Sequence, residues 1–389
     1  MHVLWTPSWY QTPDRPWEGT HFVEQRGILA SAGHQVGIVA LQYAPRLRPR
    51  QPTLQDAGAP VVIGEYPLSI YGAMPSDRVL AERSARAPLD LYEEIAGVPD
   101  VIHAHSVFPG AFVAMEAARR WNRPFVLTEH RPSSAGRHTW TPRFRAIRRA
   151  VQAASACVSV SAGASAEFAA FYHTVPWGVI ALPTPERFFL VPLAGRDPER
   201  FVFCTVSDLS ANKRVELTLD AFATAFRHVP GSRILVVGGE PARVTELRER
   251  ARSLGIEAAV EFTGRVPRDE IATVMAQADC FVLASAKESA GAVFGEAQAL
   301  GIPCIATRTW GGTFMVEPDA GLLVDIDDKA ALAQAMTDIA IHPERFDRAA
   351  IRARAAQRFS ADVFVEAHLV MYEKAIQTGG GPSPAPSTP

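Results

Sequence analysis

The sequence predicts an α/β protein built from two doubly wound domains, each with a largely parallel sheet covered by helices on both faces. Three observations predict this fold class. The chain has 389 residues, more than one hydrophobic core usually supports. Short apolar runs alternate with helical patterns, which is typical of parallel sheets. The alternation stops at a proline-rich stretch and then starts again.

The first domain is expected to alternate strands and helices from its beginning. Its strands are short apolar runs, and its helices carry apolar residues at helical spacing. Strands are predicted at residues 2–7, 35–41, 101–106, 125–130 and 157–162, and helices at 22–33 and 110–121.

A break in this pattern separates the two domains. Residues 181–200 contain four prolines and no helical period, which suits a hinge. After the break, a helix is predicted at 215–226, and strands at 201–207, 233–239, 260–264, 280–285, 303–307 and 321–324. We therefore expect Rossmann-like domains at 1–186 and 187–362. Residues 377–389 are rich in Pro, Gly and Ser and are expected to form a disordered tail.

The two halves also resemble each other. Residues 101–130 and 280–309 both run strand, loop, glycine, helix, proline, strand. Ligands of open α/β sheets bind beyond the carboxyl ends of the strands. Two such domains facing each other predict a binding cleft between them.

Composition excludes several classes of function and partner. A formal net charge of −2 gives no general attraction to nucleic acid. No apolar run approaches the roughly 20 residues of a membrane-spanning helix. The four cysteines lie in apolar runs without metal-ligand spacing, which predicts free thiols and a cytoplasmic location.

The segment KESAGAVFGEAQALG, residues 287–301, contains two acids, Glu288 and Glu296, with seven residues between them. Glu288 is expected in a strand-to-helix loop, and Glu296 in a helix that begins near Gly291 and ends before Gly301. The free N–H groups of Gly291, Ala292 and Val293 would form the positive end of that helix. A diphosphate fits there, and the flanking carboxylates can accept hydrogen bonds from sugar hydroxyls. Taken by itself, Glu288 is better interpreted as a partner of the helix dipole.

In this context the segment resembles the E-x7-E motif of retaining glycosyltransferases of family 4, also called group 1, which have the two-domain GT-B fold. The resemblance extends over most of the chain. PSWYQTPDRPWEGTHFVEQRGILASAGHQV is similar to the first strand, loop and helix of one branch of the family. DVIHAHSVFPGAFVA, FVLTEH, VSDLSANKRVELTLDAF, FTGRVPRDEIATVMAQADCFVLAS and GIPCIATRTWGG resemble later motifs in order and spacing. The last helix, 363–376, is similar to the family helix that packs back on the first domain.

The resemblance implies a role for each matching residue of the second domain. Glu288 would bind hydroxyls of the transferred sugar and Glu296 the ribose of the nucleotide. Lys213 would neutralise the diphosphate together with the amides at Gly291, Ala292 and Val293. Gly264 and Arg265 lie where the family's base-contacting loop runs. Without the motif series, Lys213 would read as a solvated lysine at a helix start.

The resemblance also implies two sites in the first domain. Gly19 occupies the loop that closes on the phosphates, and His105 the position of a histidine that faces the reacting sugar. His103 lies two residues from His105 on the same strand, so both side chains share a face. No third ligand at fitting spacing is evident, so we expect no metal and interpret His103 as packing. His130 ends the next strand and suits either the cleft or a loop.

Two departures from the family pattern affect donor binding. Asp208 stands where an arginine often precedes the lysine by five residues, and Met315 where a glutamate often follows the Gly-Gly pair. Losing a bidentate guanidinium should weaken binding by about 1.5–3 kcal/mol unless another cation replaces it. Arg214 and Arg265 are candidate replacements. Ala290 also stands where an aromatic residue is usual.

The implied reaction transfers a glycosyl group from a nucleotide sugar to a hydroxyl acceptor with retention, with no separate cofactor. The acceptor is left open as a glycan, a lipid-linked sugar or a small molecule. Two rival hypotheses are a non-catalytic nucleotide-sugar-binding paralogue, motivated by the two departures, and an epimerase of the same fold. The transferase is favoured because the chain has the matching residues Glu288, Glu296, Lys213 and His105.

Three arginines of the first domain form a basic cluster along one predicted helix. Arg145, Arg148 and Arg149 lie in RFRAIRRA, residues 143–150. The cluster suits weak peripheral contact with the inner face of a membrane, or an acidic acceptor. It also suits an ordinary solvated face, which is common on soluble helices.

Overall fold

The computed structural model describes residues 1–13, 15, 18–44, 50–56, 58–67, 76–130, 142–173, 177–193, 195, 197 and 200–379. The chain forms two compact units. The first unit comprises Met1–Ile180 and the residues from Val365 onward, and the second comprises Ala181–Phe364.

The first unit is built on a sheet with the strand order β3-β4-β2-β1-β5-β6-β7-β8. Its strand pairs are parallel except at the edge, where β3 runs antiparallel to β4. Side chains along β5 and β6 are buried throughout, as expected for strands covered on both faces. The strands are β1 (His2–Pro7), β2 (Gln35–Ala44), β3 (Thr53–Asp56), β4 (Pro60–Pro67), β5 (Val101–His105), β6 (Phe125–Glu129), β7 (Ala156–Ser159) and β8 (Gly178–Val179).

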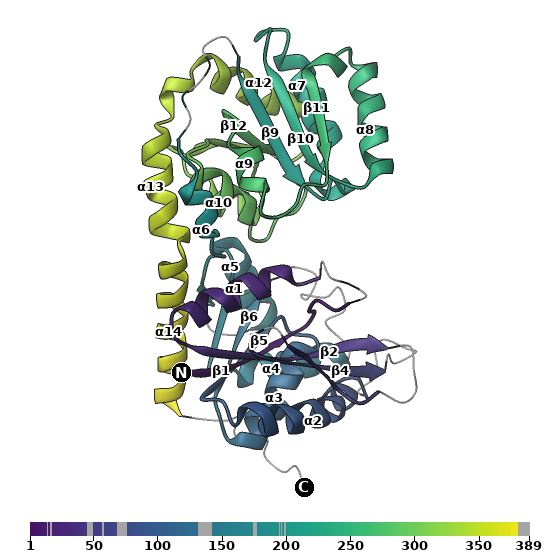
Figure 1. Ribbon diagram of the computed structural model, residues 1–389, viewed down its shortest axis with the longest axis vertical. Coiled ribbons are helices and arrows are strands. Elements are labelled where there is room, and N and C mark those ends of the chain that lie inside the picture. Colours follow the sequence, from purple (N-terminus) through teal and green to yellow (C-terminus); the bar gives the residue numbers. More distant parts are fainter. Residues whose placement is uncertain are drawn as a thin grey trace. The chain divides into compact units, whose positions relative to one another are not determined.

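Helices cover both faces of this sheet. In Figure 1, α1 lies on one face and α2 and α3 lie on the other. The last helix also belongs here, because Tyr372 of α14 shares hydrogen bonds with Trp5 of β1 and His103 of β5. The helices are α1 (Thr20–Ser31), α2 (Ser76–Ala96), α3 (Gly110–Trp121), α4 (Pro142–Ala153), α5 (Ala162–Tyr172) and α14 (Ala361–Thr378).

The second unit is built on a parallel sheet with the strand order β11-β10-β9-β12-β13-β14. Successive side chains point to opposite faces, so each strand contributes to two cores. Phe203 of β9 and Val282 of β12 join one core, whereas Cys204 and Phe281 join the other. The strands are β9 (Val202–Ser207), β10 (Arg233–Gly238), β11 (Val260–Gly264), β12 (Cys280–Leu283), β13 (Cys304–Thr307) and β14 (Gly321–Val324).

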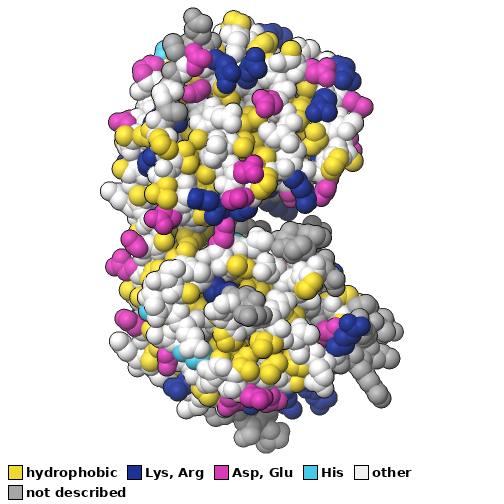
Figure 2. Space-filling model, in the orientation of Figure 1, with side chains coloured by type: hydrophobic (Ala, Val, Ile, Leu, Met, Phe, Trp, Pro, Cys, Tyr) yellow, Lys and Arg dark blue, Asp and Glu magenta, His cyan; other side chains and the backbone are white. Residues whose placement is uncertain are grey.

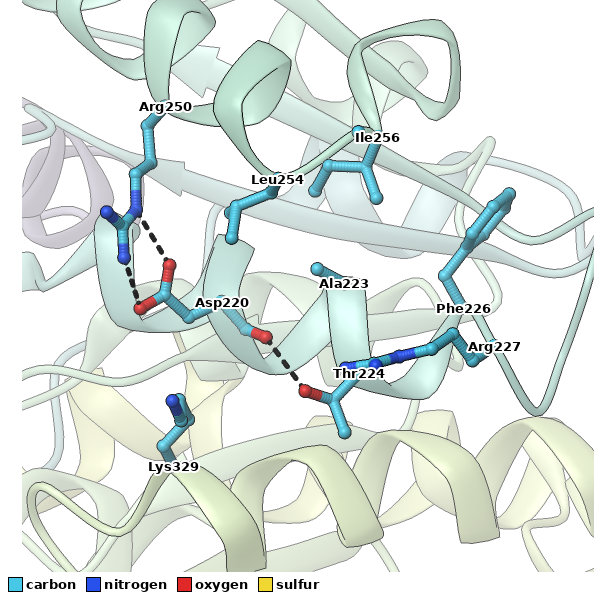
Figure 3. Close-up of a pocket in the computed structure, with 10 residues that line it drawn as sticks. Asp220, Ala223, Thr224, Phe226, Arg227, Arg250, Leu254, Ile256 and Lys329 are labelled. Carbon is cyan, nitrogen blue, oxygen red and sulfur yellow. Dashed lines mark hydrogen bonds and ion pairs between the residues drawn. The ribbon is translucent and has the colours of Figure 1, made fainter.

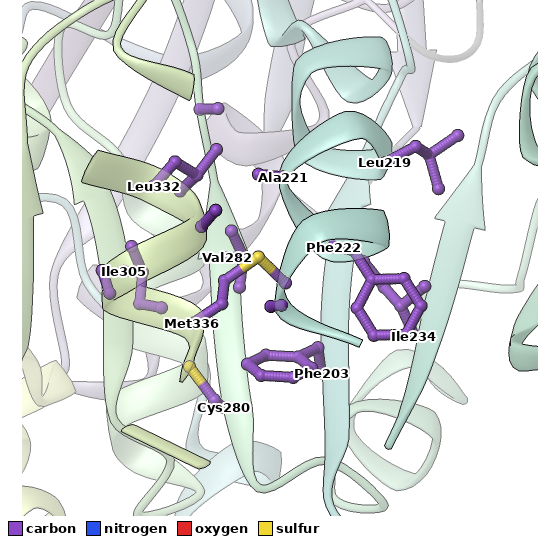
Figure 4. Packing of buried hydrophobic residues seen from close by; sticks show 14 of the residues in the cluster. Phe203, Leu219, Ala221, Phe222, Ile234, Cys280, Val282, Ile305, Leu332 and Met336 are labelled. Atoms are coloured by element: carbon purple, nitrogen blue, oxygen red, sulfur yellow. The ribbon is translucent and has the colours of Figure 1, made fainter. Parts of the chain in front are cut away.

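The two cores of this sheet take different helices. Figure 4 shows the first core, where Leu219 and Phe222 of α7 and Leu332 and Met336 of α12 pack on the sheet. Helices α9, α10 and α13 contribute to the second core. The helices are α6 (Glu186–Leu190), α7 (Val215–Ala225), α8 (Pro241–Ser253), α9 (Ile271–Met275), α10 (Ala292–Ala299), α11 (Trp310–Met315), α12 (Lys329–Ile341) and α13 (Arg348–Phe359), with 3-10 turns η2 (Ala211–Lys213), η3 (Glu257–Ala259) and η4 (Pro343–Arg345).

The structure corrects the sequence expectations at two places. The expectation of no helix within 181–200 is wrong, because α6 forms there and its Phe188 is fully buried in a core of the second unit. The predicted tail begins too early, because α14 continues to Thr378. Residues 380–389, the rest of that tail, lie outside the described residues. In the described parts of the chain, no helix is long and apolar enough to span a bilayer.

Each sheet contains a point where the strand order reverses direction. In the second unit it lies between β9 and β12, and in the first unit between β1 and β5. Loops that leave adjacent strands there run to opposite faces of the sheet, which opens a crevice at the carboxyl ends of the strands. The predicted site residues Lys213 and Glu288 follow β9 and β12, and His105 ends β5.

Candidate active site

The loops after β9 and β12 are joined through one side chain. Asn212 donates from Nδ2 to the carbonyl of Lys287 (2.9 Å) and accepts at Oδ1 from the Lys287 N–H (3.1 Å). The Asn212 carbonyl also accepts from the Ala286 N–H (2.8 Å). These bonds hold the two loops together, so the residues that follow them have a fixed relative position.

Lys213 and Glu288 form an ion pair between these loops. The ammonium Nζ lies 2.7 Å from Glu288 Oε2, and Ser285 Oγ donates to the same oxygen at 3.3 Å. The side chains are 21% and 16% exposed, so the pair is neither buried nor free in solvent. Sequence reasoning singled out both residues, and the structure brings them into contact.

The amino end of α10 lies directly after Glu288 in the chain. Gly291 is its N-cap, with φ of 69° in the left-handed region that favours glycine. The first N–H groups of a helix have no acceptor within it, so those of Ala292 and Val293 form the positive end. Gly311 packs closely here: a Cβ on it would lie 3.0 Å from the Gly291 nitrogen. A diphosphate beside this end would meet backbone donors and the Lys213 ammonium.

Glu296 lies within α10 and is also paired with a cation. Its side chain is 6% exposed, and Oε1 lies 2.5 Å from Nη2 of Arg268. The Arg268 guanidinium lies over the ring of Phe188, 5.8 Å from its centroid. Sequence reasoning missed Arg268. The available signal was a second basic residue three positions after Arg265 in the same loop.

The predicted base-contacting residues lie at the end of β11. Gly264 has φ of 68° and open space where a Cβ would be. Arg265 is 68% exposed and forms an ion pair with Glu240. A role of either residue at the base stays a prediction.

A histidine cluster occupies the switch point of the first unit. His103 is fully buried, with Nδ1 2.7 Å from the Tyr372 hydroxyl and Nε2 2.7 Å from Thr128 Oγ1. Both ring nitrogens are therefore occupied within the core. Burial lowers the pKa of His103 well below its usual value.

His105 lies deeper than the sequence suggested. It is 1% exposed, with its ring packed against Trp5 and Phe22 at centroid distances of 4.4 and 5.0 Å. Its Nδ1 lies 3.0 Å from Nε2 of His130, which is half-buried. Burial, reinforced by the neighbouring histidines, holds the pKa of His105 well below its usual value. His130 is thus more exposed than His105, and a sugar-facing role of His105 stays a prediction.

Two further residues fix the loops around this cluster. Glu129 is fully buried and accepts from Ser106 Oγ (2.5 Å) and from the N–H groups of Val107 (3.0 Å) and His130 (2.8 Å). Gly19, the N-cap of α1, is buried with φ of 68°, and a Cβ there would lie 3.0 Å from the Phe22 ring. The proposed action of Gly19 on phosphates stays a prediction.

Comparison with known proteins identifies the chain's family. Residues 19–183 match the model described as Glycosyltransferase Family 4, and residues 192–357 match Glycosyl transferases group 1. A D-inositol 3-phosphate glycosyltransferase from Rhodococcus opacus is 30% identical over 315 residues, covering 74% of this chain and 70% of that protein. The chain belongs to glycosyltransferase family 4.

Other relatives of this family 4 chain match over shorter stretches. A D-inositol 3-phosphate glycosyltransferase from Rhodococcus erythropolis is 36% identical over 200 residues, 49% of this chain and 45% of that protein. An N-acetyl-alpha-D-glucosaminyl L-malate synthase from Bacillus anthracis is 32% identical over 172 residues, 43% of this chain and 44% of that protein. The chain thus aligns with less than half the length of these two relatives.

Solved structures confirm the GT-B fold of this family 4 member. Sucrose-phosphate synthase from Thermosynechococcus elongatus gives a TM-score of 0.72 at 17% identity, covering 97% of this chain and 99% of that one. HepE from Anabaena, solved with UDP-glucose, gives a TM-score of 0.68 at 19% identity, and the match covers 96% of this chain and 99% of that one.

The departures from the family pattern have structural explanations. Asp208 accepts at Oδ1 from both the N–H (3.0 Å) and the hydroxyl (2.9 Å) of Ser210, so it closes a turn after β9. Met315 is 2% exposed and packs in the second core of this unit.

Of the two candidate replacement cations, Arg214 pairs with Asp327 and Arg265 with Glu240. Among these residues, Lys213 is the cation that contacts the motif itself.

A pocket elsewhere in the second unit is not the site. It has a volume of about 390 Å³ and lies between α7, α8 and the start of α12 (Figure 3). Asp220 and Arg250 pair within it at 2.7 Å, and none of the predicted site residues line it. Its Thr224 and Phe226 lie at the carboxyl end of α7, the opposite end from Lys213.

Metal-ligand clusters and the distribution of charge were compared with the expectations for this family 4 chain. Over the described ranges, no three His, Cys, Asp or Glu side chains lie close enough together to hold a metal ion. On the face that Figure 2 shows, basic and acidic side chains are interspersed.

Proposed function

We propose that this chain transfers a glycosyl group from a nucleoside-diphosphate sugar to a hydroxyl acceptor with retention of anomeric configuration. The observation that carries the proposal is the contact of Lys213 with Glu288, directly before the amino end of α10. A cation, the first amides of a helix and a carboxylate thus lie in adjoining segments. Glycosyl transfer from a diphosphate needs all three.

The electrostatics suit departure of a diphosphate. Breaking the glycosidic bond leaves negative charge on the leaving group. Lys213 and the N–H groups of Ala292 and Val293 stabilise that charge, because preorganised donors act most strongly where charge develops. On this proposal no metal ion is required, and transfer should persist in EDTA.

The ion pairs of the free protein give the two glutamates distinct roles. Donor binding would move Lys213 from Glu288 to the phosphates and free that carboxylate for sugar hydroxyls. Glu296 would bind the ribose, and its contact with Arg268 at Oε1 would hold the carboxylate in place for this. Arg268 thereby becomes a positioning residue for the nucleotide.

Retention is proposed to follow a front-face path, in which the leaving phosphate accepts the proton of the acceptor. A double-displacement path would need a carboxylate nucleophile. In the histidine cluster, both oxygens of Glu129 are engaged by Ser106, Val107 and His130. Trapping of a covalent glycosyl-enzyme would contradict the front-face path.

A screen of nucleotide sugars tests the proposed donor class. Thermal unfolding would be compared with UDP-, GDP-, ADP- and TDP-sugars, because a ligand at 100 times its Kd stabilises by about 2.7 kcal/mol. UDP-sugars come first, since HepE has been solved with UDP-glucose. Product anomers read by NMR then test retention. Failure of every donor to bind would contradict the proposal.

A non-catalytic nucleotide-sugar-binding role is the second candidate. The observation that favours it is Asp208, which closes a loop turn where the family often has a phosphate-binding arginine. Slow hydrolysis of a bound donor by the pure protein would exclude this role. Binding without hydrolysis, and without transfer to any acceptor, would establish it.

We further propose that the protein is located in the cytoplasm and contacts a membrane surface weakly. All four cysteines are free, and burial raises the pKa of Cys157 and Cys204 to about 12, which suits inert thiols in a reducing cytoplasm. Arg145, Arg148 and Arg149 are exposed on α4, whereas Phe144 and Ile147 are buried. We propose that these arginines give weak electrostatic contact with an anionic membrane surface.

A further inference from the structure

The loop after β9, residues 208–214, carries Lys213 and has an unusual backbone. Leu209 and Arg214 have φ angles of 54° and 49°, in the left-handed region that residues with a Cβ rarely adopt. Such residues persist only where the surrounding structure holds them, and they cluster at active sites. The shape of this loop must therefore be fixed by contacts with other segments.

Both of these residues are held from outside the loop. Leu209 is fully buried, and its carbonyl accepts a hydrogen bond from Nε of Arg243 in α8 (2.9 Å). Arg214 forms an ion pair with Asp327, which follows β14. The two ends of the loop are thus anchored to α8 and to the loop after β14. Neither anchor belongs to the loop after β12, which carries Glu288.

Asn212 joins the middle of the loop to the loop after β12. Its Nδ2 donates to the Lys287 carbonyl, and its Oδ1 accepts from the Lys287 N–H. The Asn212 carbonyl accepts from the Ala286 N–H. An amide side chain supplies a donor and an acceptor at once, whereas an ionised aspartate supplies acceptors only. Asn212 directly precedes Lys213 in the chain, and its partner directly precedes Glu288, so these bonds lie one residue from the ion pair.

The ion pair of Lys213 and Glu288 joins the same two loops, but it cannot hold them throughout the reaction. On the proposed function, the Lys213 ammonium moves from Glu288 to the phosphates of the donor. The bonds of Asn212 involve no side-chain atom of either residue, so they are kept when the ion pair opens.

We infer that Asn212 is a positioning residue, which holds Lys213 in place relative to Glu288 and the amino end of α10 when the ion pair opens. Without the Asn212 side chain, the loop would stay anchored at both ends, yet the distance of Lys213 from that helix end would vary. Preorganised cations stabilise a leaving group best, because they need no rearrangement as charge develops. The consequence for the reaction rests on the proposed function, whereas the joining of the two loops does not.

Amide hydrogen exchange, followed residue by residue with NMR, tests the joining of the loops without any donor. The reporter is the Ala286 N–H, because its acceptor, the Asn212 carbonyl, remains in Asn212→Ala. We expect that variant to exchange this proton about tenfold faster or more, and Lys213→Met, which lacks the ion pair, to change the rate less than about twofold. Asn212→Asp, which loses the donor, is a second variant with the same expected direction. Exchange in Lys213→Met as fast as in Asn212→Ala, or no change in either Asn212 variant, would overturn the inference.

Transfer kinetics test whether Asn212 acts through Lys213. We expect Asn212→Ala to lower kcat about tenfold in the wild-type background and less than about twofold in Lys213→Met, because a positioning residue matters little once the group it positions is gone. The control is Ser210→Ala, which removes a hydrogen bond to Asp208 within the same loop and should change kcat less than about twofold. Equal losses from Asn212→Ala in both backgrounds would show a merely structural role. If the wild type transfers no sugar from any donor, the proposed function fails, and the exchange rates still decide whether Asn212 joins the loops.

Discussion

The switch points of the two units have the same topology and opposite electrostatics. In the second unit, β9 and β12 lead to Lys213 and Glu288, a charged pair with partly exposed side chains. In the first unit, β5, the neighbour of β1, carries His103 and His105, which are buried and neutral. The comparison teaches that the fold fixes where a ligand can bind, and that the loop residues decide what it can be.

The difference matches two kinds of ligand chemistry. An ion pair at a helix amino end can exchange its internal partner for a phosphate. A neutral cluster of rings favours groups that form hydrogen bonds without charge, such as hydroxyls.

The largest effect is expected at Lys213. Lys213→Met removes the cation that stabilises the leaving diphosphate, so kcat/KM should fall by about 100- to 1000-fold, the range found when one transition-state donor is lost. Initial transfer rates measure this. The control is Lys287→Met, which removes an exposed charge from the same loop and should change the rate less than about twofold. Similar losses in both variants would remove the special role of Lys213.

A smaller effect, confined to binding, is expected at Glu296. Glu296→Gln weakens a charge-assisted bond to the ribose and should raise the donor KM by about tenfold to a hundredfold, with kcat little changed. Glu270→Gln, an exposed acid close to Arg268 in the chain, serves as the control. A fall in kcat at constant KM would place Glu296 in the chemical step instead.

The buried histidines predict that stability falls in acid. Burial lowers the pKa of His103 and His105 in the folded state, so below about pH 6.5 the unfolded state binds more protons. Unfolding free energy should fall as pH falls through this window, by up to about 1.4 kcal/mol per pH unit for each ring, and neither ring should contribute above about pH 7. Urea titrations at several pH values, with His105→Asn as comparison, measure the slope. An identical slope in the variant would contradict neutral burial of His105.

The smallest effect is expected on the surface of α4. Replacing Arg145, Arg148 and Arg149 by Gln should reduce binding to anionic vesicles, where each arginine contributes about 1 kcal/mol at most. The free energy of unfolding should change by less than about 0.5 kcal/mol, because these side chains are exposed. Unchanged vesicle binding would leave the cluster as a solvated face.

The sequence predicted the charged site better than the neutral one. Lys213 and Glu288 follow adjacent strands, so strand order alone brings their loops together. The depth of His105 depends on Phe22 of α1 and on Tyr372 of α14, which packs behind His103 from the far end of the chain. No local pattern shows such packing. Arg268 was missed for the same reason, because its loop meets Glu296 only in the folded unit.

Helix α6 shows a second limit of local patterns. The prolines of 181–200 indicated a hinge, yet the turn around Phe188 forms because that ring is buried against the core of the second unit. Its short length leaves too few residues for a helical period to be visible.

The central claim is that Glu288 acts on the sugar of a donor whose phosphates bind beside it. The most direct measurement compares wild type and Glu288→Gln with the best donor from the screen, recording both the thermal shift and the transfer rate. We predict that the variant still binds the donor and that its turnover falls about 100-fold or more. Full turnover by Glu288→Gln would contradict the account.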